Sequence, residues 1–171
     1  GKTVSLIASY LRWSNYTFRN QNHIVAGRTM GALNRNVIEI MKQIMNAWGW
    51  QYIEHRGEER YIYIINTGNI YYLFGADNEA SSSKVQGLTA ASYFHDEIAL
   101  SPKTFIEMAM GRCSVDGSKF WFNCNPEKPD HFVKVEIIDR ADNKNEDFKF
   151  YHLHFTMDDN LTLSPEKRRM Y

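Results

Sequence analysis

Cysteine is scarce in this chain, and long apolar runs are missing. Among 171 residues there are two cysteines, Cys113 and Cys124, with no CxxC pair. Two isolated thiols argue against a disulfide framework and a four-cysteine zinc site, and favour reduced, buried side chains. No apolar run approaches the ~20 residues that cross a bilayer, and we expect no signal peptide and no membrane partner.

Net charge is also absent, because 20 lysines and arginines balance 20 aspartates and glutamates. A balanced total gives no indication of nucleic-acid binding, although it can conceal a local basic patch. The hydrophobic content of 43% and the aromatic content of 14% are enough for a core. The length suits one domain or a piece of a larger protein, and the first residue is Gly1 rather than Met, so we expect a fragment.

Apolar strands alternate with helical patterns along the chain. Helices are expected from Thr3, over 37–45, after Ser101-Pro102, over 129–138 and from Ser164. Gly49 is expected to end the second of these helices, and Ser101 to cap the third. Strands are expected at 23–26, 51–54, 61–65, 70–74, at the apolar run ending in Asp96-Glu97, and at 119–123 and 149–155. Residues 15–22 are expected to form a turn, and 75–87 a surface loop. This order predicts a largely parallel α/β sheet with helices on both faces and an antiparallel insert.

The first three residues match the end of a phosphate-binding loop. The full pattern is G-x-x-x-x-G-K-[ST], and Gly1-Lys2-Thr3 supplies its last three positions just before an amphipathic helix. Backbone N–H groups at a helix start attract phosphate. Lys2 would neutralise phosphate charge and the Thr3 hydroxyl would ligate Mg²⁺. The plainer interpretation is a helix start with an exposed lysine.

Two adjacent carboxylates, Asp96 and Glu97, end an apolar strand. Strand ends of this kind are where α/β folds bind ligands, and Mg²⁺ prefers one or two carboxylates with several waters. Asp96 is the candidate metal carboxylate, and Glu97 is the candidate general base for an attacking water. The alternative is a pair of solvated acids. His95 falls on the opposite face of the strand and is assigned to packing.

A second strand end carries Asn123 and Asn125, followed by proline. An amide next to a γ-phosphate can sense it and couple hydrolysis to motion. Asparagine and proline are equally at home in a turn. Lys84 and Arg112 are candidate charge-stabilising fingers, or else ordinary surface charges. Because these features follow one another in the right order, we interpret them as one nucleotide site.

These segments resemble the ATPase domain of the large terminase subunit of tailed bacteriophages, over nearly the whole chain. The resemblance rests on Gly1-Lys2-Thr3, Arg28-Thr29, and residues 73–77, 84–88, 94–97, 123–126 and 154–160. It implies a RecA-like P-loop NTPase fold and an ATPase that uses Mg²⁺ to drive double-stranded DNA into a procapsid. It also implies a ring of subunits on the portal protein, a small terminase subunit that delivers DNA, and a place in the bacterial cytoplasm at the portal vertex.

By position, the resemblance assigns Gly1, Lys2 and Thr3 to the phosphate loop and Arg28 to nucleotide binding. It implies that Asp96 and Thr3 bind the metal ion, Asp96 through its carboxylate. It also implies that Glu97 and Lys2 are catalytic residues. Asn123 and Asn125 match the coupling motif. Lys84 falls near the position of a catalytic finger that acts on a neighbouring subunit.

The chain departs from the family pattern at both ends. The first strand and the first half of the phosphate loop are missing, so residues 1–171 are expected to be an ATPase domain truncated at its N-terminus. The nuclease domain that follows in the family is not expected here. Two alternatives stay open: a helicase-like P-loop ATPase, and a non-catalytic prophage remnant that acts as an interaction domain.

Overall fold

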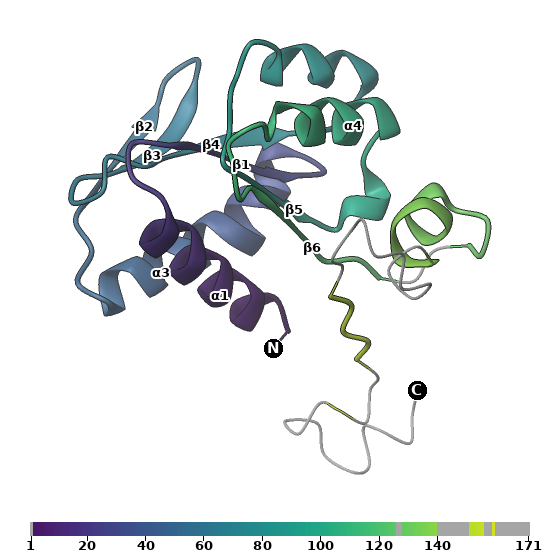
Figure 1. Ribbon diagram of the computed structural model, residues 1–171, viewed down its shortest axis with the longest axis horizontal. Helices are drawn as coiled ribbons and strands as arrows, with labels where there is room; N and C mark the ends of the chain where they lie inside the picture. The colour runs from purple at the N-terminus through teal and green to yellow at the C-terminus, as the bar shows by residue number, and fades with distance from the viewer. Residues whose placement is uncertain (1, 126–127, 140–150, 156–158, 160–171) are drawn as a thin grey trace. The chain divides into compact units, whose positions relative to one another are not determined.

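The structure, a computed structural model, describes residues 2–125, 128–139, 151–155 and 159 (Figure 1). The chain divides into two compact units, one of residues 2–126 and one that includes residues 127–171. The first unit contains the sheet and the candidate site. Among the described residues, no helix combines the length and the apolarity needed to cross a membrane.

The first unit is built on a sheet with the strand order β2-β3-β4-β1-β5-β6. Its strands are β1 (Asn22–Gly27), β2 (Tyr52–Arg56), β3 (Arg60–Ile64), β4 (Ile70–Gly75), β5 (Ser92–Asp96) and β6 (Lys119–Phe122). Strands β4, β1, β5 and β6 run parallel, and β2 and β3 join as an antiparallel hairpin beside β4. The expected parallel sheet with an antiparallel insert is therefore confirmed.

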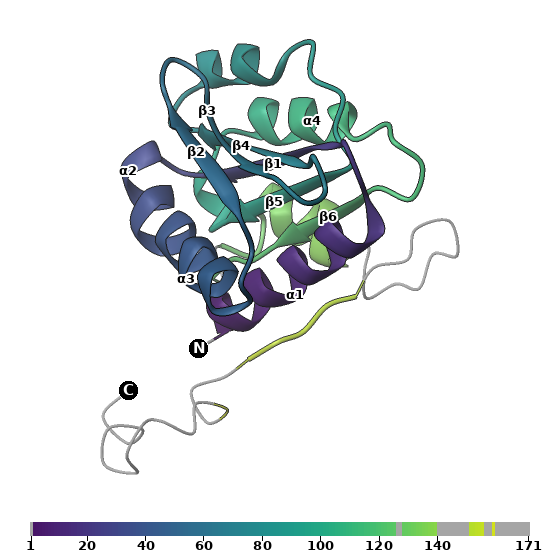
Figure 2. The same cartoon turned by 90° about the vertical axis from the view of Figure 1, so that its left-hand side faces the viewer.

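Helices cover both faces of the sheet (Figures 1 and 2). The helical segments of this unit are α1 (Lys2–Thr17), α2 (Met30–Leu33), η1 (Asn34–Ile38), α3 (Glu39–Ala47), η2 (Glu79–Val85), η3 (Ile98–Leu100) and α4 (Lys103–Arg112). Helices α1 and α3 lie side by side under one face, and α4 packs with η2 over the other. In the second unit, η4 spans Val133–Ile138. The first unit thus forms the expected three layers.

A buried polar network holds α1 on the sheet. The Ser92 hydroxyl on β5 lies 2.8 Å from the Tyr10 hydroxyl and 2.7 Å from His23 Nδ1. The Ser14 hydroxyl meets the Tyr71 hydroxyl at 2.7 Å, and the Tyr71 ring stacks on His23. A buried polar group costs free energy unless it is paired, so these bonds favour one placement of the helix. That placement also fixes the start of α1, where Lys2 and Thr3 lie.

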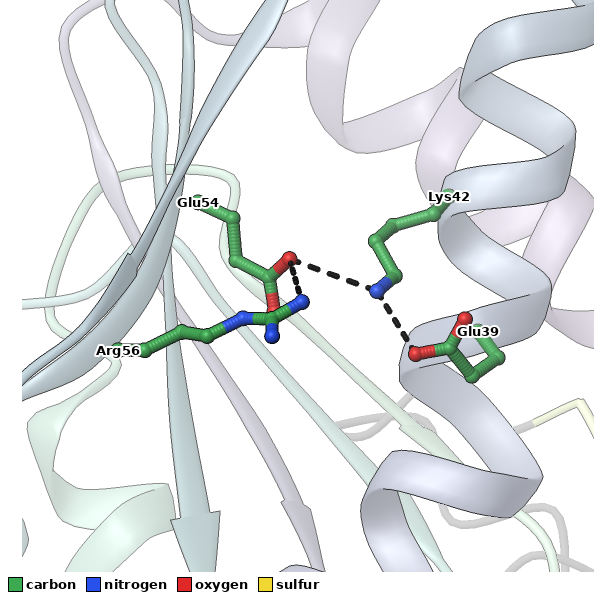
Figure 3. A network of polar contacts seen from close by, with 4 residues as sticks. All are labelled: Glu39, Lys42, Glu54 and Arg56. Carbon is green, nitrogen blue, oxygen red and sulfur yellow. Dashed lines mark hydrogen bonds and ion pairs between the residues drawn. The ribbon is translucent and has the colours of Figure 1, made fainter.

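A charge network joins α3 to the edge strand β2 (Figure 3). Lys42 Nζ lies 2.7 Å from Glu39 and 3.4 Å from Glu54, which also meets Arg56 at 2.9 Å. The Arg56 hydrogen bond and the Lys42 charge lower the pKa of Glu54. The hydrogen bond that Lys42 donates to Glu39 raises the pKa of Lys42. The network therefore supports the hairpin insert against the helical layer.

Three expected boundaries are wrong, each because side chains find tertiary partners. Helix α1 continues to Thr17 through the predicted turn, since Asn15 is buried and its side chain accepts a hydrogen bond from Thr67. The predicted loop 75–87 contains the 3-10 helix η2, whose first turn is capped by the Asn78 side chain. Ser101 does not cap α4, because Pro102 holds the cap position and the serine hydroxyl lies against His95.

The predicted strand at 149–155 is also wrong over the residues that the structure describes. Residues 151–155 have no strand pairing, and Tyr151, Leu153 and Phe155 are exposed. A strand is defined by its ladder, and here no described neighbour provides one. The predicted helix at 129–138 is shorter than expected and is observed as η4. The helix predicted from Ser164 lies outside the described residues.

Candidate functional site

Three chain segments meet at the carboxyl edge of the parallel strands. The start of α1, the end of β5 and the end of β6 border one cavity of about 380 Å³. Such a volume is typical of small-ligand pockets. The cavity is lined by Lys2, Thr3, Arg35, Asn36, Ile40, Asp96, Glu97, Asn123, Cys124 and Asn125. The structure therefore brings together the helix start, the paired acids and the asparagine segment that the sequence singled out.

Asn123 bridges the two acids. Its side-chain Nδ2 donates to Asp96 Oδ1 at 2.8 Å, and its Oδ1 accepts from the Glu97 backbone N–H at 2.6 Å. The backbone of Asn123 also bonds to this segment: Asn123 N donates to His95 O, and Asn123 O accepts from Ile98 N. Together these bonds fix the end of β6 to the end of β5. Asn123 thus orients the Asp96 carboxylate and the turn that follows it.

Glu97 occupies a backbone conformation that is rare for a residue with a side chain. Its φ is 54° and its ψ is 52°, in the left-handed region. Such a residue costs free energy and persists where its surroundings hold it, often at functional sites. The turn carries the Glu97 side chain to the cavity that Asp96 also lines.

The other wall of the cavity is basic. Lys2 lies in the first turn of the sixteen-residue helix α1, and its Nζ donates to Asn125 Oδ1 at 3.3 Å. Thr3, next to it, also lines the cavity. The N-terminal end of a helix carries a partial positive charge and free N–H groups, which favour anions. Positive groups therefore line the same cavity as the two carboxylates.

The donor set of this cavity suits Mg²⁺ bound with a triphosphate. The Thr3 hydroxyl and the Asp96 carboxylate are hard oxygen ligands of the kind that Mg²⁺ accepts. Asp96 is 6% exposed, so its carboxylate is largely removed from bulk water. Lys2 and Arg35 offer positive charge to phosphate oxygens. The residues present fit both groups.

His95 lies on the opposite face of β5, as expected, and is fully buried. Its Nε2 lies 2.8 Å from the Ser101 hydroxyl, and its Nδ1 meets the Tyr93 hydroxyl. Burial lowers the pKa of His95 to about 3, so the ring is neutral at physiological pH. The neutral ring can donate at one nitrogen and accept at the other, which matches its two hydroxyl partners.

Several candidate residues lie away from the cavity. Arg28 directly follows β1 and is exposed, and Lys84 is exposed on η2; neither lines the cavity. Arg112 donates to Met108 Sδ at 3.5 Å. Gly1 lies outside the described residues. Roles for Arg28 and Lys84 at the nucleotide therefore remain predictions.

Sequence reasoning missed four of the lining residues: Arg35, Asn36, Ile40 and Cys124. The first two belong to η1, a π-helical stretch between α2 and α3. Such stretches are rare and are frequent at functional sites, but they leave no simple periodicity in a sequence. Cys124 could have been found from its place between Asn123 and Asn125.

A family model described as "Terminase large subunit, T4likevirus-type, N-terminal" matches residues 1–169. The large terminase of a thermophilic bacteriophage is 46% identical, with a TM-score of 0.86 over 100% of this chain and 42% of that one. The chain thus spans about two fifths of the length of that terminase. The same thermophilic-phage terminase has been solved in complex with ADP, at 46% identity and a TM-score of 0.87 over the same shares.

A complex of the thermophilic-phage terminase with ATP-gamma-S gives 45% identity and a TM-score of 0.84, covering 100% of this chain and 41% of the other. The HK97 bacteriophage large terminase is 13% identical, with a TM-score of 0.62 over 83% of this chain and 31% of that one. The HK97 likeness shows the fold alone. No curated protein matches the chain.

Proposed function

The chain belongs to the terminase large subunit family, and on this basis we propose that it is the ATP-hydrolysing motor part of a phage DNA-packaging machine. The observation that carries the proposal is the convergence of Lys2, Thr3, Asp96 and Glu97 on one cavity, with Asn123 bridging the two acids. The thermophilic-phage complexes with ADP and ATP-gamma-S support a nucleotide as the ligand.

Each residue has a definite part in the proposed reaction. Lys2 and the start of α1 would hold the phosphates, and Thr3 and Asp96 would hold Mg²⁺. The metal, when bound, neutralises phosphate charge. Glu97 orients a water molecule for attack on the γ-phosphorus and accepts its proton. Hydrolysis then yields ADP and phosphate, and the base must return its proton before the next turnover.

Coupling to movement is proposed to run through the β6 end. Asn125 holds Lys2 Nζ here, and an incoming phosphate competes for the same ammonium. Asn123, two residues earlier in the sequence, is hydrogen-bonded to the Asp96 carboxylate and to the Glu97 backbone. If Lys2 exchanged Asn125 for a phosphate, the segment after β6 would lose its hydrogen bond to Lys2. This change supports the coupling role expected of Asn123 and Asn125.

The wider assembly is part of the same proposal. We infer double-stranded DNA as the cargo, and the portal protein and a small terminase subunit as partners, from membership of the family. The motor would work as a homo-oligomeric ring in the host cytoplasm at the portal vertex. In such a ring, exposed Lys84 is available to a neighbouring subunit's nucleotide. Arg28, at the same sheet edge as Asp96, is available in its own subunit.

The test is ATP turnover in a chain extended at its N-terminus with a complete phosphate loop. Glu97→Gln should lower kcat by roughly a hundredfold or more, because the proton acceptor is lost, while nucleotide binding persists. Glu58→Gln, an exposed acid in the β2–β3 turn, is the matched control and should leave kcat unchanged. Equal turnover in the two variants would remove Glu97 as the base.

Binding separates the alternatives. A chain that fails to bind Mg²⁺–nucleotide with its loop complete would be a non-catalytic interaction domain. Unwinding of a duplex, rather than translocation along it, would favour a helicase-like ATPase.

A further inference from the structure

The short segment between β5 and α4 is attached to the rest of the fold at both ends. It begins with Asp96 and Glu97, which Asn123 holds from the β6 side. It ends at Ser101, whose hydroxyl lies 2.8 Å from His95 Nε2 on the opposite face of the sheet. The two ends are therefore fixed by residues from two different strands.

Inside this segment the backbone is strained and closely bonded. Glu97 adopts the left-handed conformation, Leu100 N donates to Glu97 O at 2.9 Å, and Ser101 N donates to Ile98 O at 3.2 Å. A residue in this conformation keeps it only while its neighbours determine it. Ser101 is the last point at which the segment is held before α4 starts.

The Ser101 hydroxyl bonds to His95 instead of capping α4. A serine before a helix commonly caps it, yet α4 has no side-chain cap, and Pro102 takes the cap position. The hydroxyl instead points into the core, where Ser101 is 6% exposed. His95 is in turn held by the Tyr93 hydroxyl, and its ring packs edge-on against Phe105 of α4 at 6.0 Å.

We propose that His95 is a positioning residue that sets the place of the Glu97 carboxylate through its hydrogen bond to Ser101. The inference rests on the proposed function, since it treats Glu97 as the base. Asn123 fixes where the segment leaves β5, and the His95–Ser101 bond fixes where it rejoins α4. Without the His95–Ser101 hydrogen bond, the segment relaxes from the left-handed conformation at Glu97. The Glu97 carboxylate is then no longer positioned to accept a proton from the attacking water.

The test compares Ser101→Ala with Ser101→Thr, which restores a hydroxyl, in the chain extended with a complete phosphate loop. Ser101→Ala should lower kcat by roughly tenfold, because small misplacements of a catalytic group are costly, with KM nearly unchanged. Ser101→Thr should recover most of that loss. Ser118→Ala is the control, because it also removes a hydroxyl with a hydrogen bond inside the fold, to Cys113 O at 2.9 Å, but away from the cavity.

Two further readouts separate positioning from general damage. In a Glu97→Gln background, Ser101→Ala should cause no additional loss of kcat, since the group it acts through is already absent. Without nucleotide, Ser101→Ala should speed hydrogen exchange at the Leu100 and Ser101 amides roughly tenfold, and Ser118→Ala should leave the exchange rates of these two amides unchanged.

Unchanged exchange, or an equal fall of kcat with and without the Glu97 carboxylate, would overturn the positioning role. His95→Phe, which keeps a ring beside Phe105 but removes both nitrogens, should reproduce Ser101→Ala. A normal kcat in this variant would also overturn the proposal. Absence of hydrolysis in the loop-completed chain without substitutions would overturn the proposed function alone, because the exchange comparison needs no nucleotide.

Discussion

Asn123 has the largest part in the site of any single uncharged side chain. It bonds to the buried Asp96 carboxylate and to the Glu97 backbone, and both hydrogen bonds are partly buried. Asn123→Ala should lower the free energy of unfolding by about 1–3 kcal/mol, since Asp96 loses a partner. Asn125→Ala removes only an exposed contact to Lys2 and should cost less than about 1 kcal/mol. Urea unfolding of both variants checks this, and equal losses would contradict the bridge.

His23 makes the stability of the fold depend on acid. Burial lowers the pKa of His23 to about 3, from an ordinary 6.5, against a smaller opposing effect of the Asn69 side chain. Between pH 3 and pH 6.5 the His23 ring is therefore protonated in the unfolded chain and neutral in the folded chain. Stability should be constant above about pH 7 and fall as the pH drops from 6.5 toward 3, by up to about 1.4 kcal/mol per pH unit for this residue.

Replacement of His23 checks the assignment. Denaturant titrations from about pH 4 to 8 should show that His23→Phe, which keeps a ring against Tyr71, reduces the acid-side slope by about one proton. A slope identical to that of the original chain would place the acid sensitivity elsewhere.

At this scale the sequence predicted residues but not their partners. The predicted residues Lys2, Thr3, Asp96, Glu97, Asn123 and Asn125 all line the cavity. The bridge made by Asn123 and the core-facing hydroxyl of Ser101 were missed. Both depend on which elements lie beside β5, and a residue's own neighbours in sequence do not encode that.

Among the elements, the π-helical stretch η1 is the one whose irregularity bears on the site. It places Arg35, an exposed cation, on the wall of the cavity. Arg35→Ala should weaken nucleotide binding by roughly fivefold to tenfold, because a charge-assisted contact to phosphate is lost. Arg60→Ala, an exposed arginine on β3 outside the cavity, is the control. Fluorescent-nucleotide titration measures both, and equal affinities would remove Arg35 from the site.

The network of Figure 3 makes a separate contribution, between α3 and β2. The Lys42 side chain is 14% exposed and serves both Glu39 and Glu54. Lys42→Met should lower the free energy of unfolding by about 1 kcal/mol, and the loss should shrink in high salt. Chemical unfolding at low and high ionic strength checks this. A loss that salt does not change would point to packing of the lysine stem instead.

Element types were predictable because strand and helix patterns are local. The buried runs of β1 and β5 and the hairpin of β2 and β3 were expected near their observed bounds. The end of α1, the helix η2 and the missing strand at 151–155 were not. In each case the outcome depends on a distant partner: Thr67 for the end of α1, α4 for η2, and a pairing strand for 151–155.

For the molecule as a whole, the central claim is that one cavity holds a nucleotide with its metal. A ligand that binds only the folded state must stabilise it by mass action, by about 2.7 kcal/mol at roughly one hundred times its dissociation constant. The fold class was predicted from the order of the elements, and the nucleotide was predicted from the motifs at the ends of three of them; that these motifs line one cavity supports the nucleotide.

The most direct test is the shift in unfolding free energy caused by ATP-gamma-S with and without Mg²⁺, in the loop-completed chain and in its Asp96→Asn variant. We predict that Mg²⁺ increases the stabilisation of the original chain, and that Asp96→Asn folds normally but loses the increase. An equal shift with and without Mg²⁺, or an undiminished increase in the variant, would contradict the account.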